Sequence, residues 1–135
     1  MKYLLTITLV MLFFTAKAQE INQAQEPSST SMVEQTLQKY MRGSSYNELE
    51  LLESAYVENA TLYLSSKDGF KLYTPKEYCA FFKNKTSGEF NGRFAKILAI
   101  EVIKDIATAK IEIAIPNKGM IYIDLFLLKK IENEW

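Results

Sequence analysis

Asp124 is the side chain whose surroundings best suit acid–base chemistry. It lies between Ile123 and Leu125 in a long apolar segment. A carboxylate held among apolar residues can serve as a general base. The pattern also allows an outward-facing Asp124, because the alternate residues of this segment form a fully apolar set that suits a core face: Ile121, Ile123, Leu125 and Leu127. We expect this second arrangement and keep Asp124 as a candidate base.

Aromatic side chains of the N-terminal half are the candidates for lining a ligand pocket. They are Tyr40, Tyr56, Tyr63, Tyr78 and Phe82. A tyrosine combines an apolar ring with a hydroxyl that seeks a partner when buried, so it suits a pocket wall and a core equally well. We expect these residues mainly to pack in the core, with ligand contact as the alternative.

The chain has no histidine and a single cysteine, Cys79. Without histidine, Ser-His-Asp and Cys-His catalysis and every histidine metal ligand are excluded. A reactive cysteine needs a base or a positive neighbour; Lys76 and Lys83 are the candidates, and we expect an inert, half-buried thiol. We predict no metal site and no cofactor, so that acid–base work falls to carboxylates, lysine or tyrosine.

Three long strands must position Asp124. The segments 93–104, 106–116 and 120–131 are rich in Ile, Val, Leu, Tyr and Phe, which favour strands. The second segment alternates apolar and polar residues with a period of two, which a helix cannot satisfy. Turns at Asp105 and at Asn117-Lys118-Gly119 are short, so the three strands should pair antiparallel in sequence order.

Helices and a hairpin are expected before this meander. The patterns predict helices over 31–42, 46–56 and 75–84 and a short hairpin of 60–64 with 70–73. Capping boxes should start the first helix, at Ser31 with Glu34, and the third, at Thr74 with Glu77. Gly43 should end the first helix.

The N-terminus predicts export. Lys2, the apolar run Tyr3–Phe14 and Ala16-Lys17-Ala18 form a cleavable signal peptide over residues 1–18. Residues 19–30 read as a polar, disordered lead-in, and 31–135 as one domain. Without Lys2 and Lys17 the chain keeps 14 of its 16 basic side chains against 16 acidic ones. The sequence shows no basic stripe of the kind that binds nucleic acid, so we expect no nucleic-acid partner. After cleavage of the signal peptide we expect a periplasmic or secreted protein with no membrane segment.

The order of these elements resembles the nuclear transport factor 2-like superfamily, and within it the exported bacterial proteins labelled "putative lumazine-binding". The resemblance rests on the helix Val33–Tyr40 followed by Gly43, on Ala55–Leu62, on Asp105–Lys110, and on Tyr122–Lys130 leading to Trp135. It implies an α+β fold in which a strongly curved antiparallel sheet wraps around three helices as a cone, with a pocket at the wide end. In such proteins the strand with the final Trp usually continues, so the resemblance implies either a truncation after Trp135 or a last strand that ends unusually early.

Two functions follow as hypotheses. The resemblance includes isomerases, dehydratases and proteins without known activity. We favour an exported, non-catalytic domain that binds a small, mostly apolar ligand or another protein. The alternative is a small cofactor-free isomerase or dehydratase that uses Asp124 and a tyrosine of the pocket.

The third strand also predicts a homodimer through the sheet. Its second set of side chains is nearly as apolar as the first: Met120, Tyr122, Phe126 and Leu128. A sheet face that meets water should be polar, so a second copy of the chain is expected to cover these residues.

Overall fold

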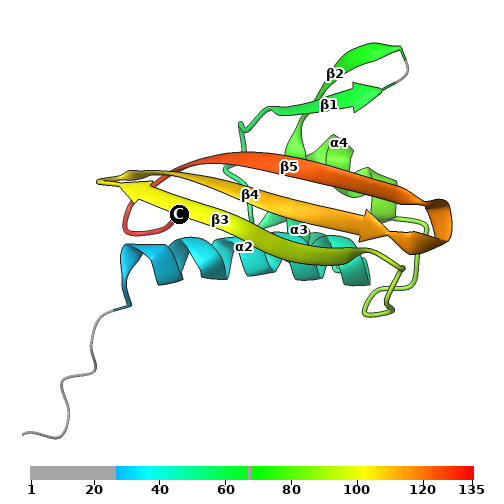
Figure 1. Ribbon diagram of the computed structural model, residues 1–135, viewed down its shortest axis with the longest axis horizontal. Helices are drawn as coiled ribbons and strands as arrows, with labels where there is room; N and C mark the ends of the chain where they lie inside the picture. Colours follow the sequence, from blue (N-terminus) through cyan, green and yellow to red (C-terminus); the bar gives the residue numbers. More distant parts are fainter. Residues whose placement is uncertain (1–26, 67) are drawn as a thin grey trace, which may run out of the picture.

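The computed structural model describes residues 27–66 and 68–135, so the predicted leader over 1–18 and most of the lead-in lie outside it. Helices and strands occur in the predicted order (Figure 1). The helical elements are α2 (Ser29–Tyr46), α3 (Leu49–Glu53), α4 (Pro75–Cys79) and the 3₁₀ turns η1 (Ala80–Phe82) and η2 (Pro116–Lys118). The strands are β1 (Leu62–Ser66), β2 (Gly69–Tyr73), β3 (Phe94–Ile103), β4 (Ile106–Ile115) and β5 (Met120–Lys129).

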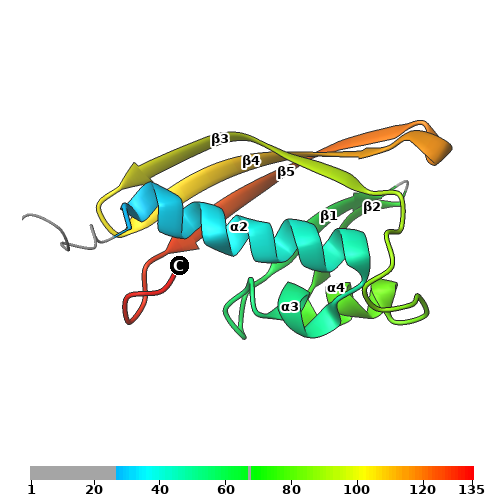
Figure 2. The same cartoon turned by 90° about the horizontal axis from the view of Figure 1, so that it is seen from below.

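The long strands form one layer, and the helices lie on one side of it (Figure 2). β3, β4 and β5 pair antiparallel in sequence order, which confirms the predicted meander. β1 and β2 form a separate two-stranded sheet that stands beyond β5 (Figure 1). We call the side of the meander that packs on the helices the inner face, and the opposite side the outer face.

Helix α2 is longer than predicted at both ends. It begins after Ser28, whose hydroxyl accepts from the Ser31 N–H at 3.2 Å, so Ser28 and not Ser31 is the N-cap. It passes through Gly43 and ends at Tyr46, where Asn47 takes the left-handed conformation with φ 59°. Gly43 does not end α2 but is buried against α3. The two helices are so close here that a Cβ on Gly43 would lie 2.6 Å from the Leu52 nitrogen. Close helix–helix approach explains this glycine.

The other helices are shorter than predicted. α3 ends at Glu53, and the chain continues to Tyr56 in tighter turns in which the Ala55 N–H bonds to the Leu52 carbonyl. The helix expected over 75–84 is α4 followed by η1. Its predicted capping box is present: the Thr74 hydroxyl accepts from the Glu77 N–H and the Glu77 carboxylate accepts from the Thr74 N–H.

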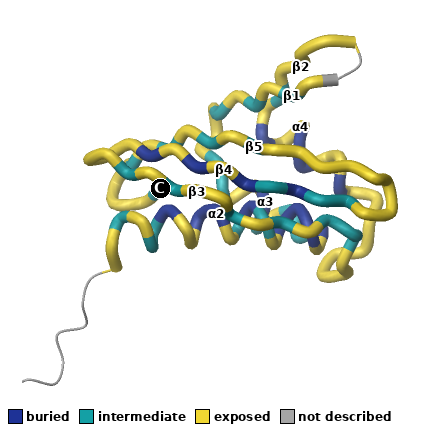
Figure 3. The backbone as a smooth tube through the Cα atoms, viewed as in Figure 1, coloured by how far each residue is buried: buried dark blue, intermediate teal, exposed yellow. Residues whose placement is uncertain are grey.

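Strand β4 carries the centre of the sheet core, as its alternation predicts. Ala107, Ala109, Ile111 and Ile113 are buried, and the residues between them are exposed or of intermediate burial. Figure 3 shows the buried stretches along β4. The helices supply the opposing core residues, which are Val33, Leu37, Tyr40, Leu52, Tyr78, Cys79 and Phe82. β3 keeps its own apolar residues inward only by a bulge at Leu98, where the register with β4 shifts.

The faces of β5 are the reverse of those predicted. Ile121, Ile123, Leu125 and Leu127 are 52–81% exposed on the outer face, whereas Phe126 and Leu128 pack against the core. Residues paired across neighbouring strands share a face, and Asp124 pairs with the buried Ile111. The residues proposed above for self-association therefore belong to the inner face, and the expectation that Asp124 points to solvent was wrong.

The end of the chain closes onto α2. After β5, Ile131 and Glu134 form an isolated antiparallel bridge, and the Trp135 carbonyl accepts from the Thr36 hydroxyl at 3.1 Å. Trp135 packs against the core cluster. None of the helices in residues 27–66 and 68–135 is long and apolar enough to cross a membrane.

Candidate functional site

Asp124 and Tyr40 form the centre of the site. The Tyr40 hydroxyl, from the buried face of α2, donates to Asp124 Oδ2 at 2.5 Å. Asp124 is half-buried on the inner face of β5. No donor among the described residues reaches its other oxygen, Oδ1, so this carboxylate can still accept a hydrogen bond or a proton.

Two further tyrosines, Tyr56 and Tyr78, adjoin this pair, and we call Tyr40, Tyr56 and Tyr78 the tyrosine cluster. The Tyr40 and Tyr78 hydroxyls lie 3.3 Å apart. Tyr56 packs edge-on against both of the other rings, with centroids 6.3 and 6.4 Å away. Of the remaining candidates, Phe82 adjoins the tyrosine cluster through Tyr78, with the two ring centroids 5.6 Å apart. Tyr63 does not, because it is 71% exposed on the hairpin.

Burial keeps the hydroxyls of the tyrosine cluster protonated. Loss of hydration is the main cause that raises the pKa of Tyr40 well above its ordinary value of 10.0, and the charges of Tyr78 and Asp124 add to it. Burial likewise raises the pKa of Tyr56 and of Tyr78. Each hydroxyl therefore serves as a donor at neutral pH, toward Asp124 or toward a bound molecule.

Arg93 is the site residue that the sequence reasoning missed. It immediately precedes β3, and its guanidinium carbon lies 5.6 Å from the centre of the Phe82 ring. Its positive charge lowers the pKa of Tyr78 and of Tyr56, against the larger effect of burial. Nothing in the local sequence pattern marks it; only the fold brings it to the tyrosine cluster.

The loop before β3 is fixed to the end of α2, and this holds Arg93 in place. The Asn91 side chain donates to the Ser44 carbonyl at 2.7 Å and to Asn47 Oδ1 at 2.6 Å. Its own side-chain oxygen accepts from the Arg93 N–H at 3.2 Å. Asn47 in turn donates to two carbonyls of the loop, those of Thr86 and Glu89. The helix that carries Tyr40 thus also holds the loop that carries Arg93.

Cys79 contributes packing, not reactivity. It is 5% exposed, and burial raises the pKa of its thiol to about 11. Because the thiolate is the nucleophilic form, Cys79 is poorly suited to nucleophilic catalysis. Within residues 27–66 and 68–135, no three His, Cys, Asp or Glu side chains gather as metal ligands.

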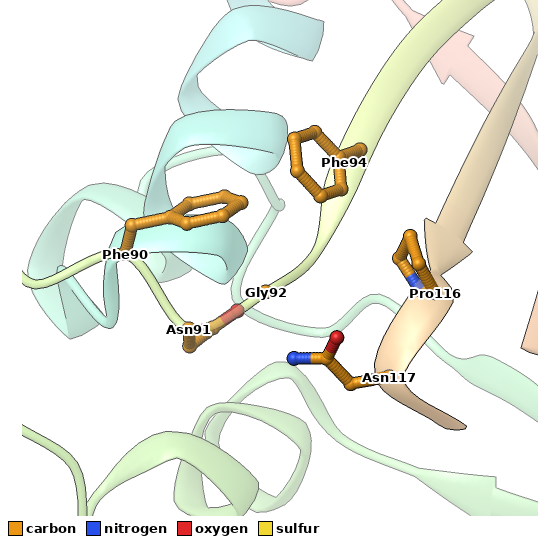
Figure 4. A pocket seen from close by; sticks show the side chains of 6 residues that line it. All are labelled: Phe90, Asn91, Gly92, Phe94, Pro116 and Asn117. Carbon is orange, nitrogen blue, oxygen red and sulfur yellow. The ribbon is translucent and has the colours of Figure 1, made fainter. Parts of the chain in front are cut away.

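Two hollows lie away from the tyrosine cluster. One, of about 400 Å³, is lined by Phe90, Asn91, Gly92, Phe94, Pro116 and Asn117. Figure 4 shows the two phenyl rings on one side of it and the Asn117 amide on the other. The second, of about 380 Å³, lies against β3, β4 and β5 and includes Glu101, Lys110 and Leu125. We place the site at Asp124 because the first hollow has no titratable side chain, and the charged side chains of the second, Glu101 and Lys110, belong to the outer face of the sheet.

The fold is that of nuclear transport factor 2-like proteins. Three solved structures of such proteins, each described as of unknown function, share the fold. The one from Shewanella baltica OS155 has 23% identity and a TM-score of 0.64, covering 77% of this chain and 83% of its own. Those from Silicibacter pomeroyi DSS-3 and Methylobacillus flagellatus KT have 17% and 21% identity and TM-scores of 0.66 and 0.67. They cover 77% and 82% of this chain and 85% and 88% of their own chains, respectively.

Within this class the chain belongs to the family described as "Putative lumazine-binding", whose model matches residues 28–135. The resemblance inferred from the sequence and the α+β fold class are thereby confirmed. No curated protein matches the chain.

Proposed function

We propose that this protein binds a small, flat, mostly apolar molecule on the inner face of its sheet, with a ligand N–H donating to Asp124. The observation that carries this proposal is a half-buried carboxylate with one oxygen held by Tyr40 and the other without a protein donor among the described residues. Aromatic rings with a few well-placed polar groups are typical of ligand sites. Asp124 and Tyr56 each retain accessible surface, so a ligand can reach them.

Lumazine is the first probe to test, because the family description names it and because it is flat with ring N–H groups. We expect it to bind the purified protein in a calorimetric titration, and we expect Asp124→Asn to weaken binding about tenfold or more, the usual effect of removing a charged hydrogen-bond partner. Glu112→Gln is the matched control, since it removes a carboxylate from the outward-facing side of the same sheet. Equal affinity of all three proteins would contradict the proposal.

Proton transfer is a second candidate function, favoured by the same Asp124–Tyr40 pair. Asp124 Oδ1 would remove a proton beside a ketone, and the Tyr78 hydroxyl would donate to the enolate oxygen, because Tyr40 already donates its one proton to Asp124 Oδ2. Cyclohex-3-enone is a suitable probe, because moving one proton from C2 to C4 gives cyclohex-2-enone. Turnover that Asp124→Asn abolishes would establish catalysis, and binding of lumazine without any turnover would leave the binding function.

We also propose that the protein works outside the cytoplasm. Lys2, the apolar run of residues 3–14 and the small residues at 16 and 18 support a removable leader. N-terminal sequencing of the protein recovered outside the cytoplasm should return Gln19 as the first residue. A product that begins at Met1 would contradict this.

A further inference from the structure

Arg93 differs from the other arginine of the chain in having no acidic partner. Arg42 lies on the surface and binds Glu48 through Nε and one terminal nitrogen, at 2.9 Å each. Arg93 takes part in none of the ion pairs among residues 27–66 and 68–135. Its Nε is buried and no described group accepts a hydrogen bond from it. Buried donors are nearly always paired, so an orphan one calls for an explanation.

A structural role explains this arrangement poorly. A buried Nε–H without an acceptor lowers stability, and an apolar residue of similar size would pack against Phe82 without that cost. The Phe82 ring faces the guanidinium at 5.6 Å, which is within the range of a cation–π contact. A ring face, however, does not accept a hydrogen bond from Nε as an oxygen would. Arg93 therefore has a donor, Nε–H, for an oxygen that residues 27–66 and 68–135 do not supply.

We infer that Arg93 binds an anionic group, most simply a carboxylate, at one end of the ligand whose other end meets Asp124. This inference rests on the proposed ligand site and names the chemical class of its occupant. A guanidinium binds a carboxylate through two parallel hydrogen bonds and takes its Nε–H into that contact. Arg93 is of intermediate burial, so part of its side chain is accessible to a ligand although Nε itself is buried.

The backbone positions of Arg93 and Asp124 are separated along the sheet, so that one molecule can extend from one to the other. Arg93 precedes Phe94, which pairs with Ala114, so Arg93 lies near the end of β4 at Ile115. Ile115 pairs with Met120, and Asp124 lies four residues after Met120 on β5. At about 3.3 Å per residue, the Asp124 backbone is therefore about 13 Å from that of Met120 along the strand direction. Both charges act on the pKa of Tyr78, so this hydroxyl lies within the field of each. The ligand is thus an elongated, flat acid with its anion at Arg93.

The test compares 2-naphthoate with its neutral isostere 2-naphthamide, by NMR titration of the whole protein. We expect naphthoate to bind about tenfold more tightly than naphthamide, and Arg93→Met to remove this preference. Arg42→Met, the same change at the paired arginine, should keep it. The unfolding temperature of Arg93→Met should equal or exceed that of the wild type, because no partner is left unpaired.

The outcomes separate this inference from the proposed function. Equal binding of the two probes to the wild type overturns the role of Arg93, and this comparison needs no variant to fold. If neither probe binds while lumazine does, the anion site is also overturned and the proposed function stands. If lumazine fails as well, both are overturned. A large fall in the unfolding temperature of Arg93→Met would show that Arg93 is structural.

Discussion

Gly43→Ala should destabilise the protein by about 2 kcal/mol, although it places a better helix former in the middle of α2. Alanine gains about 1 kcal/mol over glycine within a helix. Here its Cβ would lie 2.6–2.7 Å from the nitrogen, Cα and Cβ of Leu52 in α3. Since the first two are backbone atoms, the helices must move apart, and overpacking of this kind costs about 3 kcal/mol at the upper end of its usual range.

Chemical denaturation of the wild type and the variant measures this difference. Gln38→Ala is the control, because Gln38 is exposed on the same helix and its replacement should change stability by less than about 0.5 kcal/mol. A Gly43→Ala protein as stable as the wild type would mean that α2 and α3 are not in close contact. Tyr40 lies one turn before Gly43, so the same contact also positions the site.

Leu125→Lys should convert a dimer into a monomer. We propose that the protein self-associates through the outer face of β5, where Ile121, Ile123, Leu125 and Leu127 are 52–81% exposed. Burying an apolar patch of several hundred Å² at about 25 cal/mol per Å² favours association. The neighbouring strands support a second copy as the partner, since their outward residues include two charges of each sign, Lys96, Glu101, Lys110 and Glu112. A two-fold pairing can bring opposite charges together.

Light scattering at micromolar concentration decides this proposal. Leu72→Lys is the matched control, because Leu72 is 63% exposed on the hairpin, outside the meander. The wild type and Leu72→Lys should have the mass of a dimer, and Leu125→Lys that of a monomer, since a desolvated charge at the centre of the interface is costly. A monomeric wild type would contradict the proposal.

The sequence predicted the meander and the order of the elements, but it misplaced the faces of β5. Both sets of side chains on this strand are apolar, so alternation alone could not select one. The length of the loop between β4 and β5 fixes the faces of β5. The predicted turn comprised Asn117, Lys118 and Gly119, but the connection also includes Pro116, so that Ile115 pairs with Met120. A shift of one residue in register moves every side chain to the other face. The clean alternation of β4, combined with the correct loop, would have placed Asp124 inside.

The candidate site could be predicted only in part, for a similar reason. Tyr40, Tyr56, Tyr78 and Phe82 were named as aromatic residues and do come together. Their partners come from distant strands: Asp124 is 84 residues from Tyr40 in the sequence, and Arg93 stands in a loop without a recognisable motif. Tyr63 was misassigned because composition does not tell whether a hairpin packs on the core or projects from it.

The most direct test of the account is to locate bound lumazine on the protein by NMR. We expect chemical-shift changes on binding to be largest for the residues around Asp124, including Tyr40, Tyr56 and Tyr78, and to be much smaller in Asp124→Asn at the same subsaturating concentration. Changes confined to Phe90, Phe94 and Asn117 would place the ligand in the hollow that these residues line. This result would contradict a function at Asp124.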